Sequence, residues 1–462
     1  MVTLDATGLV EHLRATYDSG RTRPFEWREA QLDAIVRMLT EGSDELVAAL
    51  AEDLGRPELE GWSADVRLTA REVDLIRKNL RAWAVDQKFS TPAFFRPGKS
   101  WTRFEPLGVV LVIAPWNYPV QLLVLPLASA IAAGNTAIAK PSELAPATSA
   151  VVTRLAGEYL DTDAIRFVEG GVEETQALLA ERFDHIMFTG NGTVGRIVAE
   201  AAAKHLTPVT LELGGKSPVI VDRDANLEVA ASRVAGAGWL NAGQTCIAAD
   251  HVHVHQDVED EFTDLLVRQL RRRYGSDPQE SSDYGRIVNE RHARRIAGLI
   301  EAGGYDEIAY GGEVDVAERY IAPTVLRGVK PDAAVMQEEI FGPVLPILAF
   351  SDISEPIARI NAGDKPLALY LFTRSDETVE RVLSETSSGG VSVNDTLNHV
   401  ANTVLPFGGV GASGYGSYHG HWGFERFSHR KAVYRRPYRF PDVALLRPPY
   451  KPWKLRVLKK VF

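Results

Sequence analysis

Two residues of this chain have types suited to covalent chemistry: a lone thiol and a carboxylate that precedes it. The only cysteine, Cys246, ends the polar stretch Asn241-Ala-Gly-Gln-Thr-Cys246, and Glu212 lies in Leu211-Glu-Leu-Gly-Gly-Lys-Ser-Pro218. A cysteine thiolate is a strong nucleophile, and a carboxylate can serve as the base of such a site. The alternative is an inert structural thiol, because free cysteines are usually buried core residues. The cysteine alone does not decide between the two.

A glycine-rich turn offers a place for a dinucleotide. Gly190-Asn191-Gly-Thr-Val-Gly195 matches G-x-G-x-x-G, follows an expected strand and opens an expected helix over 196–204, so its N–H groups could meet a pyrophosphate. In the usual dinucleotide fold, an acid about 20 residues further on binds ribose, and Glu212 occupies that place. Spacing therefore leaves Glu212 as either a base or a ribose ligand. A second match at Gly409–Gly414 lacks the strand and helix and is expected to be a structural loop.

Further polar groups follow expected strands. Asn117, in Pro115-Trp-Asn-Tyr-Pro119, could donate its side-chain amide to a developing oxyanion, and the alternative is ordinary turn chemistry. Lys140-Pro-Ser-Glu143 also follows a strand, and its alternative is a solvated charge pair at the start of a helix. Taken alone, these residues leave both alternatives open.

The composition limits the class of protein. The chain has 462 residues, 45% hydrophobic and 24% charged, which allows two or three domains with cores of their own. A net charge of −10 argues against nucleic acid as the main partner, because no basic excess exists to neutralise phosphates. One cysteine fits a reducing compartment, and the N-terminus shows no secretory pattern. The longest apolar stretch, 120–133, is too short to span a bilayer, so we expect a soluble cytoplasmic protein.

The elements that must position these residues alternate along the chain. Residues 7–85 have helical periodicity, and 88–102 lose it, as an extended connector or arm would. Buried strands are expected at 108–113, 136–139, 164–168, 184–189 and 208–213, and in a second segment at 217–221, 251–255 and 344–350. Short apolar strands that alternate with helices predict parallel sheets covered on both faces.

Taken together, these segments resemble the aldehyde dehydrogenase superfamily, in the family's order from about residue 105 to 430. The shared elements are Pro115-Trp-Asn-Tyr-Pro119, Lys140-Pro-Ser-Glu143, Phe188-Thr-Gly190, Leu211-Glu-Leu-Gly-Gly-Lys216, Gly243-Gln-Thr-Cys246 and Glu338-Glu-Ile-Phe-Gly-Pro-Val344. The chain looks most like the class 3 branch, which oxidises medium- to long-chain and aromatic aldehydes. The segments that indicate this branch are Gly20–Pro24, Ala202–Thr210, Arg319–Pro323, Gly416–Gly420 and Phe427–Arg430.

The resemblance implies an α/β fold with a Rossmann-like cofactor domain, an α/β catalytic domain and a small β oligomerisation arm. It assigns the NAD(P)-binding domain to 1–83 and 102–213, the catalytic domain to 214–415, the arm to 84–101 and 416–440, and a C-terminal tail to 441–462. The branch implies a homodimer.

The resemblance also implies roles. Cys246 would attack the aldehyde carbon, and the Asn117 amide with the Cys246 backbone N–H would hold the oxyanion. After hydride transfer, Glu212 would activate water to hydrolyse the thioester, which makes Glu212 the base. The adenosine ribose would then fall to Lys140 and Glu143. The remaining cofactor contacts would come from Trp116, Gly190, Asn191, Gly195, Glu339 and Phe341.

The expected cofactor is NAD, with NADP tolerated. A carboxylate at Glu143 should repel a 2′-phosphate, although class 3 enzymes with the same Lys-Pro-Ser-Glu often accept both. The chain departs from the family's usual residues at Asn191-Gly-Thr193 and in the helix Ala235–Leu240. The first departure bears on phosphate geometry and the second on the shape of the aldehyde tunnel.

Tyr118, Trp239 and His399 are candidates for the wall of that tunnel, and their alternative is core packing. The tail 453–462 has apolar residues at helical spacing flanked by Lys and Arg. It could touch a membrane surface, but packing on the protein or gating the tunnel is the favoured interpretation. None of these groups is a metal-ligand set.

Two other function classes keep part of this pattern. A cysteine-dependent esterase or acyltransferase would use Cys246 without a cofactor, and a non-catalytic binding protein would need only the fold. The intact Cys246, Glu212 and Asn117 argue against the binding protein, and an acylating dehydrogenase has no need for the base Glu212.

Overall fold

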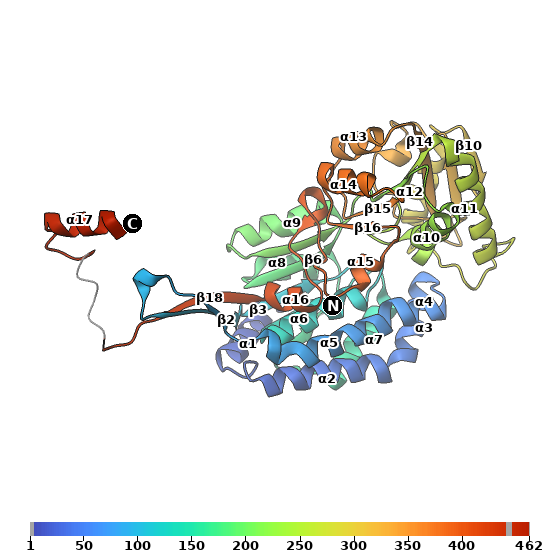
Figure 1. Cartoon of the computed structure of the whole chain (residues 1–462). Helices are drawn as coiled ribbons and strands as arrows, with labels where there is room; N and C mark the ends of the chain where they lie inside the picture. The colour runs from blue at the N-terminus through green and yellow to red at the C-terminus, as the bar shows by residue number, and fades with distance from the viewer. Residues whose placement is uncertain (1–3, 440–445, 462) are drawn as a thin grey trace. The chain divides into compact units, whose positions relative to one another are not determined.

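The computed structural model describes residues 4–439 and 446–461 (Figure 1). The chain divides into two units. The larger contains the described residues up to Trp83 and Pro106–His429, and the smaller contains Ala84–Glu105 and the described residues from Arg430 onward. All of the site residues that the sequence predicts lie in the larger unit.

The first sheet of the larger unit has six strands in the order β17-β7-β6-β3-β4-β5. They are β3 Val109–Ile113, β4 Thr136–Lys140, β5 Ile165–Phe167, β6 His185–Gly190, β7 Val209–Leu213 and β17 Gly414–Tyr415. All of them pair in parallel except β17, which runs antiparallel to β7 and sets Gly414 opposite Glu212. The chain builds outward from β3 through β4 and β5, then returns to β6, so the strand order reverses between β3 and β6. Open α/β sheets bind ligands at such a point, beyond the carboxyl ends of their strands.

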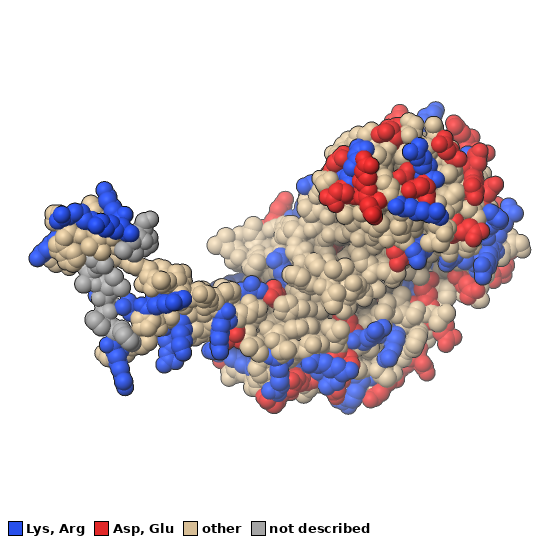
Figure 2. Space-filling model, viewed as in Figure 1, with Lys and Arg blue, Asp and Glu red and all other residues tan. Residues whose placement is uncertain are grey.

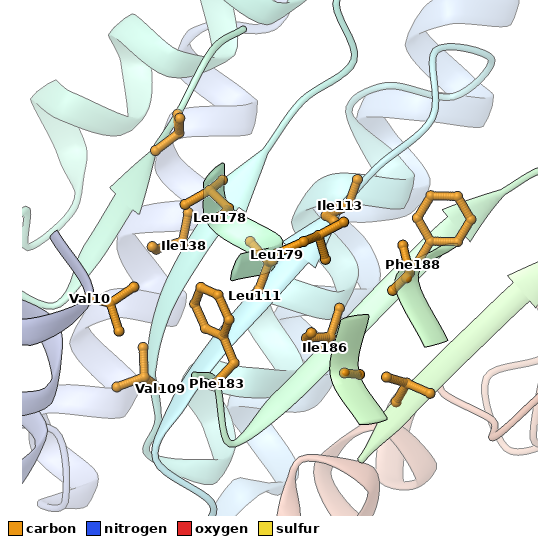
Figure 3. Close-up of a cluster of buried hydrophobic side chains, with 14 of the residues drawn as sticks. Val10, Val109, Leu111, Ile113, Ile138, Leu178, Leu179, Phe183, Ile186 and Phe188 are labelled. Atoms are coloured by element: carbon orange, nitrogen blue, oxygen red, sulfur yellow. The ribbon is translucent and has the colours of Figure 1, made fainter. Parts of the chain in front are cut away.

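One face of this sheet packs against helices α1 Ala6–Asp18, α8 Val172–Ala180 and α9 Gly192–Ala203. Val109, Leu111 and Ile113 of β3 reach this face at every second position (Figure 3). The intervening residues of β3 are buried as well, since α6 Gln121–Ala133 covers the other face. Burial on both faces explains why the strand is an unbroken apolar run.

The second sheet has seven strands in the order β10-β13-β14-β9-β8-β15-β16, and only the edge strand β10 is antiparallel to its neighbour. The strands are β8 Pro218–Val221, β9 His251–His255, β10 Glu307–Tyr310, β13 Thr324–Arg327, β14 Val344–Phe350, β15 Ala368–Phe372 and β16 Gly390–Val393. The helices of this segment are α10 Leu227–Trp239, α11 Glu259–Tyr274, α12 Glu290–Glu301, α13 Ser354–Ala362 and α14 Asp376–Glu385. A small ribbon pairs β11 Val314–Asp315 with β12 Tyr320–Ile321.

Helices α2 Phe25–Glu41, α5 Leu68–Trp83 and α16 Gly420–Arg426 pack against α6, and α3 Ser43–Leu54 packs against α7 Pro146–Tyr159. The short helix α4 Glu58–Glu60 follows α3, and α15 Asn398–Ala401 contacts β16 of the second sheet. Between α4 and α5 the helix widens into a π-helix, η1 Gly61–Arg67. Such turns are rare and are found mostly at functional sites.

The smaller unit is a three-stranded sheet of β1 Gln87–Phe89, β2 Lys99–Pro106 and β18 Ser428–Arg435, followed along the chain by helix α17 Pro452–Val461. Arg103 binds Asp86 at 2.8 Å, Lys431 pairs with Glu105, and the Tyr434 hydroxyl donates to the Phe95 carbonyl at 2.6 Å. Lys and Arg predominate on this unit in Figure 2, so the acidic excess of the chain lies on the larger unit. Across residues 4–439 and 446–461, no helix is both long and apolar enough to cross a membrane.

The smaller unit resumes later along the chain than the predicted oligomerisation arm does. Helix α16 packs against α5 and α6 in the larger unit, and a Cβ on Gly423 would overlap the Ser129 side chain. The described part of the smaller unit therefore resumes at Arg430, whereas the predicted arm resumes at 416. The predicted tail, 441–462, lies partly outside the described residues.

The α/β fold and every predicted strand are confirmed within two residues. The glycine-rich 409–414 contains a single 3-10 turn, Gly411–Ser413, and its last residue begins β17. The sequence analysis missed β10, β13, β15 and β16. These strands are four or five residues long, and β16 is bounded by glycine and follows polar turns that hide its pattern.

β17 pairs so closely with β7 that a side chain at position 414 has no room. Gly414 has a φ of +116°, and a Cβ there would overlap the carbonyl oxygen of Leu211. Gly414→Ala should therefore lower the free energy of unfolding by about 2–4 kcal/mol, because backbone atoms must move. The midpoint of guanidinium unfolding measures this change.

Gly157→Ala is the matched control. Gly157 lies within α7, and no atom lies within 4 Å of the place that a Cβ would take, so alanine should stabilise the helix by about 0.5–1 kcal/mol. Equal unfolding midpoints for the two variants would contradict the packing described for β17.

Candidate active site

The turn that carries Cys246 has an unusual backbone. After α10 ends at Trp239, Asn241 and Ala242 both have φ of +52°, and Gly243 has φ of +73°. A Cβ on Gly243 would overlap the Gly342 carbonyl, so only glycine fits there. Left-handed non-glycine residues are strained and persist only where their surroundings hold them. The turn brings Cys246 to a half-buried position that faces a cavity.

Gln244 holds the middle of this turn. Its Nε2 donates to the carbonyls of Asn241 and Arg286, both at 3.0 Å, and its Oε1 accepts from the Val288 N–H at 2.9 Å. The neighbouring Thr245 hydroxyl lies 2.8 Å from the Tyr118 hydroxyl. The residues before Cys246 are thereby fixed from several directions.

Asn117 reaches the same turn from the end of β3. Its side chain is 2% exposed, and its Nδ2 donates to the Gln244 carbonyl at 2.9 Å. An amide nitrogen carries two hydrogens, so one remains for a further acceptor. The structure therefore brings Asn117 to the Cys246 segment, as the sequence predicts.

Glu212 lies on β7 and is 3% exposed. Within the described part of the chain, neither carboxylate oxygen has a hydrogen-bond partner. Burial raises the pKa of Glu212 well above its usual value, and the Arg426 guanidinium opposes the rise. A buried carboxylate without partners is costly, which marks this group as one kept for a purpose other than stability.

The Cys246 thiol is held in its neutral form. Burial raises its pKa to about 12, the carboxylates of Glu339 and Glu212 add to the rise, and backbone N–H groups of Cys246 and Ile247 oppose it. The groups that oppose the rise are backbone donors rather than a cation.

A cavity of about 410 Å³ opens in front of Cys246. Its walls are mainly apolar and come from η1, α5, the turn after β3, the cysteine turn and the segment 397–419. The side chains that line it include Leu68, Leu75, Tyr118, Leu122, Leu240, Ile247, Val400 and Phe407. This shape suits an apolar substrate that ends at the thiol.

Tyr118 lines this cavity as predicted, but Trp239 and His399 do not. The Trp239 indole is 1% exposed and donates to the Pro343 carbonyl at 3.0 Å, so it is a core residue. The His399 ring packs between Tyr370 and Phe407, and its Nδ1 lies 3.0 Å from the Ser392 hydroxyl. The core alternative fits Trp239, whereas His399 is half-buried and its neighbours Asn398 and Val400 line the cavity.

Sequence reasoning missed three polar residues of the cavity. Glu72 bonds His419 Nδ1 at 2.8 Å and accepts from the Gly420 N–H at 2.9 Å, and both side chains line the cavity. The Tyr418 hydroxyl is buried with no hydrogen-bond partner in the described residues. The segment Gly416–Gly420 indicated the class 3 branch, but nothing in its spacing points to Glu72.

The predicted cofactor residues gather at the carboxyl ends of β3, β4, β6 and β7. Asn191 caps helix α9, accepting from the Val194 N–H at 3.0 Å, and Gly195 lets α9 approach Leu213, 2.8 Å from the place of a Cβ. Gly190 is the last residue of β6. A cleft of about 640 Å³ runs from Asn191 past Gly214 to Glu339.

Lys140 and Glu143 lie at the end of β4. Lys140 is 2% exposed, and its Nζ donates to the carbonyls of Pro141 at 3.0 Å and Gly170 at 2.8 Å. Glu143 is 3.4 Å away from the same ammonium, with its carboxylate partly exposed. The pair is anchored rather than free, unlike a solvated charge pair.

Glu339, Phe341 and Trp116 lie where the second sheet's segment approaches the first. The Phe341 and Trp116 rings meet edge to face at 5.4 Å, and a Cβ on Gly214 would overlap the Glu339 carboxylate. Burial, with a contribution from Asp250, raises the pKa of Glu339 to about 8. These residues join the cofactor cleft to the thiol.

Comparison with known proteins accounts for this arrangement. The model of the aldehyde dehydrogenase family matches residues 4–433. Aldehyde dehydrogenase family 3 member A2 of Rattus norvegicus is 48% identical over 422 residues, 91% of this chain and 87% of the relative. The dimeric NADP-preferring aldehyde dehydrogenase of Canis lupus familiaris is 44% identical over 429 residues, 93% of this chain and 94% of the relative.

A solved structure agrees over the whole chain. The substrate-bound state of Staphylococcus aureus AldH superposes with a TM-score of 0.95 at 44% identity, covering 99% of both chains. Relatives of this kind use NAD or NADP. The chain belongs to the aldehyde dehydrogenase family, is most like its family 3 members, and is an enzyme that oxidises aldehydes to carboxylic acids with NAD(P).

Proposed function

We propose that this enzyme oxidises apolar aldehydes, of medium to long chain or aromatic, through covalent attachment to Cys246. One observation carries the proposal: the Asn117 amide binds the turn that leads to Cys246, and the buried Glu212 carboxylate, which has no hydrogen-bond partner in the described residues, acts electrostatically on the thiol. An inert core thiol needs none of these neighbours.

The first step forms a carbon–sulfur bond. The Cys246 thiolate, formed when the thiol has lost its proton, attacks the carbonyl carbon. The carbon–oxygen π bond breaks, and the carbonyl oxygen becomes an oxyanion. The second Asn117 Nδ2 hydrogen and the Cys246 backbone N–H stabilise it as it forms. Because both donors belong to rigid turns, they need little reorganisation when charge develops.

The cofactor site follows the strand ends. Bound NAD(P)+ supplies the hydride acceptor. Asn191 and the N-terminus of α9, with Gly190 and Gly195 beside them, serve the pyrophosphate, and Lys140 with Glu143 hold the adenosine ribose. Glu339 would hold the nicotinamide ribose, with the Trp116 and Phe341 rings, which contact each other, as further cofactor contacts.

Glu212 completes the reaction as a base. It accepts a proton from water, the water oxygen attacks the thioester carbon, and the carbon–sulfur bond breaks to release the acid and the Cys246 thiolate. The raised pKa of Glu212 makes its carboxylate a stronger base than one in solvent. Its lack of competing partners leaves both oxygens available to water.

The proposal also covers the substrate class and the oligomeric state of the enzyme. The apolar cavity with Tyr118 in its wall suits alkyl or aryl aldehydes. We propose a cytoplasmic homodimer, and the dimeric canine relative supports the assembly. For the tail, packing on the protein or gating the tunnel is favoured over contact with a membrane.

The Glu212→Gln variant separates the two halves of the reaction. It should still form the thioester but hydrolyse it slowly, giving a burst of NADH near one per active site and a steady rate reduced about 100-fold or more. Stopped-flow absorbance with benzaldehyde or a fatty aldehyde measures both phases. Cys246→Ala, which should bind NAD+ without any turnover, is the control. Loss of NAD+ binding in Glu212→Gln with an unchanged chemical step would show a ribose ligand instead.

The pH dependence of Cys246 alkylation tests the raised pKa of this thiol. Because the pKa of Cys246 is about 12, the thiolate fraction grows about tenfold per pH unit between pH 7 and 10. The rate of iodoacetamide labelling of the cofactor-free enzyme, followed by mass spectrometry, should rise with the same slope. Glu212→Gln should label faster, since one opposing charge is gone. A rate that levels off below pH 8 would rule out the buried, uncharged thiol.

Cofactor choice should depend on Glu143. Its carboxylate repels a 2′-phosphate, so Glu143→Gln should raise kcat/KM for NADP+ relative to NAD+ by about 10-fold. Steady-state kinetics with each cofactor measure the ratio. Glu158→Gln, an exposed acid on α7, is the control and should leave the ratio unchanged. An unchanged ratio in Glu143→Gln would place the adenosine ribose elsewhere.

A further inference from the structure

Arg56 is a fully buried arginine in a segment that no site residue occupies. It lies just after α3, between Gly55 and Pro57, and its side chain is 2% exposed. Burying a guanidinium is expensive unless every donor finds an acceptor. The contacts of the Arg56 guanidinium therefore indicate why this side chain is buried.

The guanidinium binds the Asn117 turn directly. Nη2 donates to the backbone carbonyl of Asn117, the residue whose side chain reaches Gln244. The guanidinium carbon also lies 4.7 Å from the centre of the Tyr118 ring, which lines the aldehyde cavity. Arg56 thus contacts two successive residues of the turn after β3.

The same guanidinium binds the cysteine turn. Nε donates to Asn241 Oδ1 at 3.2 Å, and the Asn241 amide donates in turn to the Asn117 carbonyl at 2.9 Å and the Gln244 carbonyl at 3.2 Å. The Asn117 carbonyl accepts from both side chains. One planar fork therefore joins the two segments that carry the oxyanion donors.

Two carboxylates balance the buried charge. Asp65 of η1 binds Nη1 at 3.0 Å, and Glu60 lies 3.7 Å from Nε. Asp65 also accepts from the Gln121 N–H at the start of α6, and Glu60 accepts from the Asn241 N–H at 2.8 Å. Burial raises the pKa of Asp65 to about 6 even though Arg56 opposes the rise. The network is closed, and its members belong to three segments.

We infer that Arg56 is a positioning residue for the reaction: it holds the Asn117 turn and the Asn241–Gln244 turn in one register, so that the Asn117 amide and the Cys246 N–H converge on the same oxyanion. The inference rests on the oxyanion role proposed above. Asn241 needs such a clamp, since its φ of +52° is strained without one.

The geometry requires a guanidinium. Lysine would keep the charge and much of the stem, but it cannot direct coplanar donors to Asn117, Asn241 and Asp65 together. Arg56→Lys should therefore loosen the register of the two turns without leaving the carboxylates unpaired.

The test compares Arg56→Lys with Arg28→Lys. Arg28 is also buried, and it donates only to the backbone carbonyls of Thr22, Arg23 and Ala132, away from the cysteine turn. Stopped-flow kinetics with benzaldehyde and NAD+ measure the rate of hydride transfer, and guanidinium unfolding measures stability. Iodoacetamide labelling reports on Cys246 independently of turnover.

Arg56→Lys should slow hydride transfer by about 10- to 100-fold, the effect of misplacing one oxyanion donor. The KM for NAD+ should stay within about twofold, and labelling of Cys246 should become several-fold faster as the turn relaxes. Arg28→Lys should change stability alone. If Arg56→Lys does not fold, Asn241→Gly keeps the left-handed turn, removes its link to Arg56 and should show the same selective loss.

Equal hydride-transfer and labelling rates in Arg56→Lys and the wild type, at whatever stability, would overturn the inference. Its failure is distinct from failure of the proposed function, in which the wild type itself makes no NADH from aldehydes. In that case the rate of Cys246 labelling still tests the positioning role of Arg56. A several-fold rise in Arg56→Lys but not in Arg28→Lys supports this role, and an unchanged rate in Arg56→Lys overturns it.

Discussion

The hydrogen bond from the Asn117 amide to the Gln244 carbonyl is the contact on which the arrangement of the site depends. Asn117 lies in the turn that follows β3 of the first sheet, and Gln244 belongs to the turn between α10 and β9 in the second sheet's segment. Neither sheet alone contains a reaction centre. The first supplies a dinucleotide cleft at its strand ends, and the second supplies a thiol on a strained turn. Their junction sets the two donors and the nucleophile at one point.

Electrostatics at this junction favour the neutral forms of its acids. Burial raises the pKa of Cys246, Glu212 and Glu339 alike, and the two carboxylates raise the pKa of the thiol further. An anionic thiol or carboxylate therefore forms most readily when a ligand changes the local charge. The protein thus couples its nucleophile to occupancy of the site rather than to a resident base.

Sequence reasoning recovered what depends on short segments. Strands β3, β4, β5, β6 and β7 of the first sheet and β8, β9 and β14 of the second are mostly apolar runs with clear ends, and Cys246, Glu212 and Asn117 stand in local motifs. The sequence could not show which residues line a cavity, because that depends on which side of a helix or loop faces it. Trp239 is apolar at a helix end, and nothing in its neighbours separates a tunnel wall from the core. His399 lies among cavity-lining residues, and its own ring packs on Tyr370 and Phe407.

Contacts between residues that are far apart in the chain could not be predicted from the sequence. Glu72 meets His419 and Arg56 meets Asn117 and Asn241 only through the tertiary fold. Charged residues near Gly and Pro, as in Gly55-Arg-Pro57, have the composition of exposed loops. Only the closed set of acceptors around the guanidinium shows that Arg56 is interior.

The π-helix η1 has a consequence for how this protein can vary. Its wide turns hold one residue more than an α-helix of the same rise, and that extra residue sets the direction in which Asp65 faces. Deletion of a single residue between Gly61 and Arg67 would restore regular turns and rotate Asp65 by about 100° around the axis. The segment can therefore exchange side chains on its outer surface, but its length is fixed. In the lineage of this enzyme, insertions and deletions should be excluded here while substitutions accumulate.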